Sequence, residues 1–170
     1  MSCRLTFVCI SSAGLKYVDE VVAYFRKSAE IKRALKDEVH ISSFYIGEAK
    51  DHSAKHGPIR ESIIASDFVF LDLMGADAAT VKVIEQAVRD YQKDLAVMGS
   101  GTEYLRSRTR LGAFAFDEFS KKMRKGKNKA AAGMRNMDLD RMMKMSAVAG
   151  KISRSARGMH DWLLLQKAWT

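Results

Sequence analysis

The amino-acid sequence predicts an α/β fold, and three observations lead to this prediction. Short apolar runs rich in β-branched and aromatic residues begin near residues 5, 39, 67 and 95. Amphipathic helical segments separate these runs, so that a strand recurs about every 28 to 34 residues. This spacing is typical of strand–helix units that right-handed crossovers join into a parallel sheet. We therefore predict an open Rossmann-like or flavodoxin-like sheet of about four strands, with helices on both faces.

The first two predicted strands differ in burial. Leu5–Ile10 is a continuous apolar run, which is typical of a central strand covered on both faces. Apolar residues then recur at spacings of three and four from Leu15 to Leu35 and predict a long helix. Val39–Ile46 alternates more, which predicts a strand with one less buried face. The polar stretch after it predicts a loop or short helix up to Pro58, followed by a short helix at Ile59–Ala65.

Two further strand–helix units follow. An apolar strand ends at Gly75, and Asp77 is well placed to cap a helix over Ala78–Lys93. The run Leu95–Met98 predicts the last strand, and Thr102 is placed to cap the helix after it.

Charge is unevenly distributed along the chain. Residues 1–101 contain 13 Lys and Arg against 14 Asp and Glu, whereas residues 102–170 contain 16 against 6. A basic C-terminal part of this kind suggests an anionic partner, such as nucleic acid, a membrane surface or an acidic ligand. The alternative is a solvated helical face that contacts acidic surface in a larger assembly.

We expect three segments: a sheet domain at residues 1–120, a basic linker at 121–137 and a helical extension at 138–170. The linker has six Lys and Arg by residue 129 and no periodic apolar face. The extension is basic and methionine-rich, since seven of the ten methionines lie between residues 123 and 159. We expect it to break or kink near Gly150 and Gly158, and to continue or dock in a larger subunit.

The composition limits the function classes. Cys9 lies inside the first apolar run and Cys3 just before it, so we expect a cytoplasmic protein without a disulfide framework. No run approaches the roughly 20 apolar residues of a membrane span. His52 and His56 have the spacing of two metal ligands on a helix, but Gly57-Pro58 and the lack of a third ligand favour a solvated loop. We predict no catalytic residue, metal site or cofactor in this chain.

A first candidate site lies at the carboxyl ends of the predicted strands, where open parallel sheets bind ligands. Small residues there let backbone N–H groups approach an anion at a helix N-terminus. These residues are Ser11, Ser12, Gly75, Gly99 and Ser100. Ordinary turns are the alternative, because the sequence has neither a full dinucleotide fingerprint nor a phosphate loop.

A second candidate site follows the last strand, where Arg106, Arg108 and Arg110 precede a cluster of phenylalanines. The methionines and cations further on suit a flat apolar ligand that carries carboxylates or phosphates. The alternative is a helical hairpin that packs on its own domain.

Three stretches carry a resemblance to a known family: "DFVFLDLMGAD" from Asp67, "LAVMGSGTEYLRSRTRLGAF" from Leu95 and "HDWLLLQKAW" from His160. They resemble the N-terminal region of the large subunit of ATP-dependent tetrapyrrole metal chelatases, namely the magnesium chelatase H subunit and the cobaltochelatase large subunit. The most family-like element is Thr109-Arg-Leu-Gly-Ala-Phe114, after a strand and a helix. The resemblance covers most of this chain but a small fraction of such a subunit.

In that family, which serves chlorophyll or cobalamin biosynthesis, the large subunit binds the porphyrin or corrin and the magnesium or cobalt ion. Separate AAA+ motor subunits hydrolyse ATP to drive insertion. The resemblance implies an N-terminal module that helps enclose or position the macrocycle and is not catalytic alone. Its partners are then the AAA+ subunits, the remaining chelatase domains and the tetrapyrrole. The stretch from Arg106 to Gly112 matches the family's basic turn, which we expect to contact a neighbouring domain or ligand carboxylates.

Other function classes remain open. A nucleic-acid-binding protein would use the basic C-terminal third and bind less tightly at high salt, but few aromatic residues interleave with the cations. A small nucleotide-binding or receiver module is disfavoured because the strand ends lack its phosphate loop or acidic pocket. The apolar C-terminal "WLLLQKAW" also predicts self-association.

Overall fold

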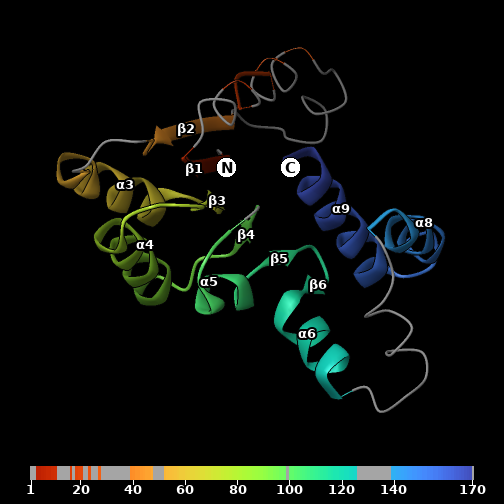
Figure 1. The fold of residues 1–170 in the computed structure, drawn as a ribbon. Helices are drawn as coiled ribbons and strands as arrows, with labels where there is room; N and C mark the ends of the chain where they lie inside the picture. The colour runs from red at the N-terminus through yellow and green to blue at the C-terminus, as the bar shows by residue number, and fades with distance from the viewer. Residues whose placement is uncertain are drawn as a thin grey trace. The chain divides into compact units, whose positions relative to one another are not determined.

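The computed structural model describes residues 3–10, 16, 18–20, 23, 27, 39–47, 52–98, 100–125 and 139–169. It divides into two compact units, Met1–Gly101 and Thr102–Thr170 (Figure 1). This division coincides with the change of charge along the sequence and lies earlier than the boundary expected at residue 120. The reason is that residues 110–115 pair with one another and pack against the C-terminal helix instead of extending the sheet.

Four parallel strands form the sheet of the first unit, in the order β2-β1-β3-β4. They are β1 (Cys3–Cys9), β2 (Val39–Tyr45), β3 (Phe68–Asp72) and β4 (Leu95–Val97). All four predicted strands are therefore present, and the predicted α/β fold with a parallel sheet is confirmed. In the core, Phe7 of β1 lies opposite Phe70 of β3, and their rings stack with centroids 4.4 Å apart.

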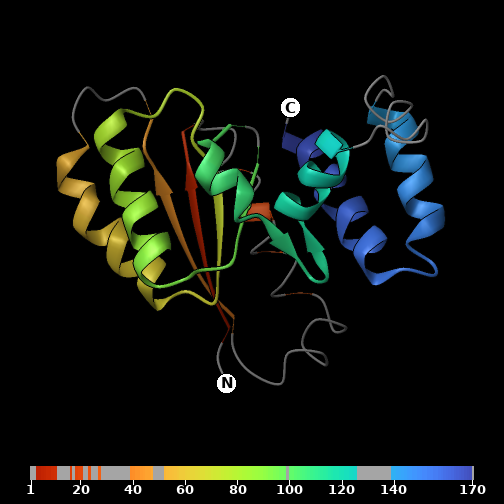
Figure 2. The same ribbon diagram turned by 90° about the horizontal axis from the view of Figure 1, so that it is seen from below.

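Helices α3 (Ser53–Ala65) and α4 (Ala78–Asp90) cover one face of this sheet (Figure 2). The Thr6 hydroxyl of β1 is buried and is hydrogen-bonded to the hydroxyls of Ser62, at 2.7 Å, and Ser66. This polar link joins the sheet to α3. The helices bury Ile59, Ile63, Thr80, Ile84, Ala87 and Val88. The helix expected over residues 15–35 lies mostly outside the described residues.

Of the loop or short helix predicted before Pro58, the structure shows a helix, which begins at Ser53 and continues through Gly57-Pro58 into the helix predicted at Ile59–Ala65. Proline lacks a backbone donor, and its ring crowds the preceding turn, so local propensity disfavours a helix here. Tertiary packing compensates for this cost. Ile59 is fully buried, and His56 Nε2 lies 2.9 Å from the Thr80 hydroxyl of α4. These contacts outweigh the local propensity.

The amino end of α4 confirms the predicted cap. Asp77 accepts hydrogen bonds from the Thr80 hydroxyl at 2.6 Å and from the Thr80 backbone N–H at 2.9 Å. These bonds hold the pKa of Asp77 below its usual value. The helix ends at Asp90 and not at the predicted Lys93, since Gln92 takes a left-handed backbone conformation with φ 49°.

The second unit begins with α5 (Glu103–Ser107), which Thr102 caps as predicted. An antiparallel hairpin follows, made of β5 (Arg110–Leu111) and β6 (Phe114–Ala115), and leads directly into α6 (Phe116–Lys125). The hairpin was not predicted. The start of the expected basic linker is helical because α6 extends to Lys125, and residues 126–138 lie outside the described part of the chain.

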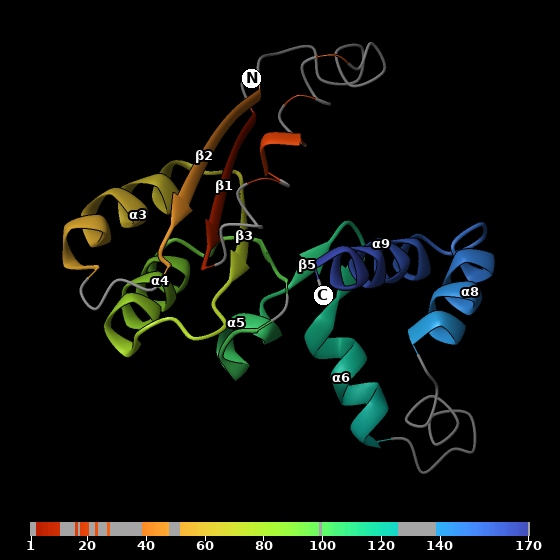
Figure 3. The same cartoon turned by 45° about the horizontal axis from the view of Figure 1, so that its top comes forward.

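Helices α8 (Leu139–Ala149) and α9 (Arg154–Trp169) form an antiparallel pair (Figure 3). Ser146 Oγ lies 3.1 Å from His160 Nδ1 between them. The break or kink predicted near Gly150 is confirmed as a break, because α8 ends at Ala149, whereas no break occurs near Gly158, where α9 continues. No helix in the described part of the chain is long and apolar enough to cross a membrane.

Replacing the cap residue of α4 tests this account of the first unit. The substitution Asp77→Ala should lower the free energy of unfolding by about 1 kcal/mol, because the Thr80 N–H loses its acceptor. Chemical denaturation of the full chain measures the loss. Asp77→Ser keeps an acceptor at the cap position and should lose clearly less. Equal losses in the two variants would contradict the capping role.

Candidate functional site

A hollow between α5 and α6 is the candidate functional site in the described part of the second unit. Its volume is about 390 Å³, which lies within the range of small-molecule sites. The lining residues are Glu103, Arg106, Ser107, Phe116, Asp117, Ser120 and Lys121. The α5–α6 hollow therefore offers two cations, two carboxylates, two hydroxyls and one aromatic ring. It suits a ligand that combines polar groups with an apolar surface.

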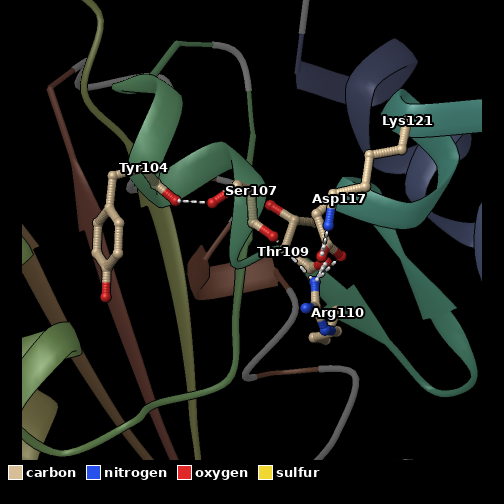
Figure 4. Close-up of polar contacts among 6 residues, drawn as sticks. All are labelled: Tyr104, Ser107, Thr109, Arg110, Asp117 and Lys121. Carbon is tan, nitrogen blue, oxygen red and sulfur yellow. Dashed lines mark hydrogen bonds and ion pairs between the residues drawn. The ribbon is translucent and has the colours of Figure 1, made fainter. Parts of the chain in front are cut away.

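The side chain of Arg110 holds the elements around this hollow together (Figure 4). Its Nη1 donates to the backbone carbonyls of Ser107 and Thr109, both at 3.0 Å, and lies 3.0 Å from Asp117 Oδ1. One guanidinium therefore ties the end of α5 and the start of β5 to the first turn of α6. Arg110 is a structural clamp, and its charge is used within the protein.

Asp117 is the carboxylate that this clamp requires. Burial acts to raise its pKa, but the charge of Arg110, the Glu118 backbone N–H and the charge of Lys121 together hold the pKa below its usual value. Lys121 Nζ lies 3.6 Å from Asp117 Oδ2. Asp117 is consequently ionised at neutral pH, and it faces two cations.

The other two arginines of the predicted site differ from Arg110. Arg106 is exposed and lines the hollow, with its guanidinium carbon 5.4 Å from the centre of the Phe116 ring. Arg108 is half-buried, and its backbone N–H closes the last turn of α5. The Arg108 Nε is buried and has no hydrogen-bond partner among the described residues. Of the three predicted site arginines, Arg106 lines the hollow.

An aromatic cluster supports the wall that carries Phe116. The Trp162 ring of α9 lies 5.2 Å from the Phe116 ring and 5.8 Å from the Phe114 ring, measured between centroids. Phe114 is buried and also contacts Phe119 of α6, at 5.9 Å. The cluster thus joins the hairpin, α6 and α9.

Gly158 permits the close approach of α9 to the hairpin. A Cβ at this position would collide with the carbonyl oxygen of Leu111 and with Phe114, so the position requires glycine. Nearby on α9, Leu163 is buried, whereas Leu164 is 44% exposed. The predicted self-association through the C-terminal segment stays a prediction, and Leu163 is already used inside the unit.

The small residues predicted at the strand ends belong to the first unit. Gly75 is exposed with a left-handed φ of 83°, and the Leu73 N–H donates to the Ser100 carbonyl at 3.0 Å. Gly75 and Ser100 therefore have structural uses, in a tight turn and in an extension of strand pairing. Ser11, Ser12 and Gly99 lie outside the described residues.

The two histidines considered as metal ligands have other contacts. His52 precedes α3 at its cap position, and His56 is hydrogen-bonded to Thr80. The solvated loop expected around them is wrong, since His56 lies in α3 and His52 is buried. In the part of the chain that the structure describes, no three or more His, Cys, Asp and Glu side chains form a group able to hold a metal ion.

Sequence reasoning missed Asp117 and Lys121, which line the hollow, and Trp162, which supports it. The sequence contained one local signal for the hairpin before α6 and one for the pair Asp117 and Lys121. Leu111-Gly112 precedes a phenylalanine in the manner of a hairpin turn, and Asp117 and Lys121 have the four-residue spacing of a helical ion pair. No such signal announces Trp162, because its contacts are distant in sequence.

A scan of protein-family models and a search of curated proteins found no match to this chain.

The close approach at Gly158 generates a stability prediction. Gly158→Ala should destabilise the second unit by about 1 to 3 kcal/mol or more, because the added methyl group collides with the hairpin. Thermal unfolding and the near-ultraviolet circular dichroism of the aromatic residues, which include Trp162, measure the effect. Ser155→Ala is the control, since it changes an exposed position of the same helix. The control should be neutral or stabilising by up to about 1 kcal/mol, and equal behaviour of the two variants would refute the packing argument.

The clamp predicts a pH dependence. The pKa of Asp117 is lower in the folded state than in the unfolded chain, so the folded state binds fewer protons. Its stabilisation is complete above the unfolded pKa, near pH 4, and is lost as the pH falls through the folded pKa. The stability difference between the wild type and Asp117→Asn should therefore shrink as the pH falls below about 4. A difference that does not change with pH, measured by denaturant unfolding, would contradict the ion pair.

Proposed function

We propose that this chain is the N-terminal module of the large subunit of an ATP-dependent tetrapyrrole metal chelatase, where it helps to enclose or position the macrocycle. The observation that supports this proposal is a contact between two of the resembling motifs. The stretch Thr109–Phe114 and the stretch that begins at His160 are far apart in sequence, yet Phe114 contacts Trp162 directly. The two stretches therefore belong to one packed part of the second unit.

The sheet agrees with this proposal. The third resembling stretch, from Asp67, contains β3 and the turn that ends at the cap Asp77. The strand order β2-β1-β3-β4 is the order of a flavodoxin-like sheet, with its switch point between β1 and β3. We infer that the first unit is a Rossmann-like or flavodoxin-like domain of the larger subunit.

In this proposal the α5–α6 hollow receives one edge of the macrocycle. Tetrapyrroles of this pathway carry carboxylate side chains on a flat conjugated ring. Arg106 supplies a cation for a carboxylate, and the Phe116 ring supplies an apolar surface beside it. The Asp117 carboxylate repels a ligand carboxylate less than an unpaired one would, because Arg110 and Lys121 already face it. Metal insertion and ATP hydrolysis are left to the remaining domains and the AAA+ subunits.

Titration with a dicarboxylate porphyrin tests the proposed function. We expect saturable binding, followed by porphyrin absorbance and by quenching of tryptophan fluorescence. Arg106→Glu should weaken binding by roughly ten- to a hundredfold, the value of a charge-assisted hydrogen bond. The dimethyl ester of the same porphyrin should also bind more weakly, because it lacks the charges. Arg110 is unsuitable for this test, since its replacement breaks the clamp.

The control for charge is Lys82→Glu, which makes the same change at an exposed position of α4 in the first unit. It should leave porphyrin binding unchanged. Equal weakening by both variants would show non-specific attraction, and no porphyrin binding by the wild type would reject a macrocycle-contacting role for this hollow.

A further inference from the structure

The exposed face of α8 and the turn after it carry apolar side chains that the described residues of their unit leave exposed. Met145, Val148 and Ile152 are 47%, 68% and 92% exposed. They recur at spacings of three and then four along the chain, and Met145 and Val148 share one face of α8. The Ile152 N–H still donates to the Ala149 carbonyl at 3.1 Å, which keeps the turn close to helical register. We call Met145, Val148 and Ile152 the α8 stripe.

Exposed cations surround the α8 stripe. Lys144 lies beside Met145, Lys151 lies beside Ile152, and Arg154 opens α9 directly after the turn. The sequence contains no Asp or Glu between Arg141 and His160. The surface therefore combines protruding aliphatic groups with positive charge, and Asp140, the carboxylate of α8 nearest to Lys144, is already paired with Lys167 at 2.8 Å.

We propose that the α8 stripe and its flanking cations dock on the surface of a membrane that contains anionic lipids. Aliphatic side chains of an interfacial helix enter the boundary between headgroups and acyl chains. Lysine and arginine stems lie along the same apolar region while their charged ends reach the lipid phosphates. The contact is peripheral, and it does not depend on the proposed role of the α5–α6 hollow.

A membrane fits this surface better than nucleic acid. Phosphates of nucleic acid would pair with the cations but would leave Ile152, which is 92% exposed, without a partner. Binding of single strands also uses aromatic rings for stacking, and no aromatic residue occurs between Arg141 and Arg157. A fluid bilayer accepts protruding side chains without a matching shape, whereas a protein partner needs a complementary groove.

Cosedimentation of the full chain with lipid vesicles tests this proposal. The wild type should bind phosphatidylcholine vesicles that contain phosphatidylglycerol, bind pure phosphatidylcholine weakly, and lose binding as salt rises. Lys144→Glu combined with Lys151→Glu should reduce binding at least about tenfold. Ile152→Ser, and separately Val148→Ser, should each reduce it by about threefold or more without changing the charge.

Matched controls lie in the first unit. Lys16→Glu combined with Lys82→Glu makes the same charge change at exposed positions, and Met74→Ser removes an apolar side chain that is 63% exposed. Both should bind vesicles nearly as well as the wild type, and circular dichroism should show an unchanged fold in all variants. Absence of binding to anionic vesicles, or equal losses in variants and controls, overturns the proposal. Retention on duplex DNA without vesicle binding also overturns it, in favour of nucleic acid.

Discussion

The ion pair between Arg110 and Asp117 is the contact on which the second unit depends. The hairpin between them has two residues in each strand, which is too short to be stable by its own hydrogen bonds. Arg110 fixes the hairpin to the end of α5 and to the first turn of α6. The hairpin is also held by α9, which packs closely against it at Gly158. The α5–α6 hollow exists because these two constraints act on the same few residues.

This arrangement separates cations that look equivalent in the sequence. Arg110 is used inside the fold, Lys167 pairs with Asp140 at 2.8 Å, and Arg106 lies beside the Phe116 ring at the hollow. The positive charge of the C-terminal part is therefore divided between structural and exposed positions. Two exposed surfaces result, and they differ in chemistry: the hollow combines charge with a shaped aromatic wall, whereas the α8 stripe combines charge with protruding aliphatic groups.

The sheet could be predicted from sequence because burial on one or both faces leaves apolar runs that are visible locally. The caps Asp77 and Thr102 were equally visible, since a cap bonds a backbone group three residues away. The start of α3 was not, because the penalty of Pro58 is local while the compensating contact joins His56 and Thr80, 24 residues apart. The end of α4 depends on the left-handed Gln92, which no composition rule indicates.

The candidate site was harder to predict than the sheet, because it depends even more on contacts between residues that are distant in sequence. The residue type predicted that the arginines form one functional cluster. Their separate roles depend on the direction in which α6 leaves the hairpin. The two strands of the hairpin were not visible in the sequence, because strands of two residues are too short to show alternation. Gly158 was interpreted as a helix break or kink because glycine weakens a helix interior. Its use is set instead by Leu111 and Phe114, which approach α9 from more than forty residues away in the chain. A glycine whose missing side chain makes room for another element has the sequence signature of a helix breaker, and only the packing partner distinguishes the two.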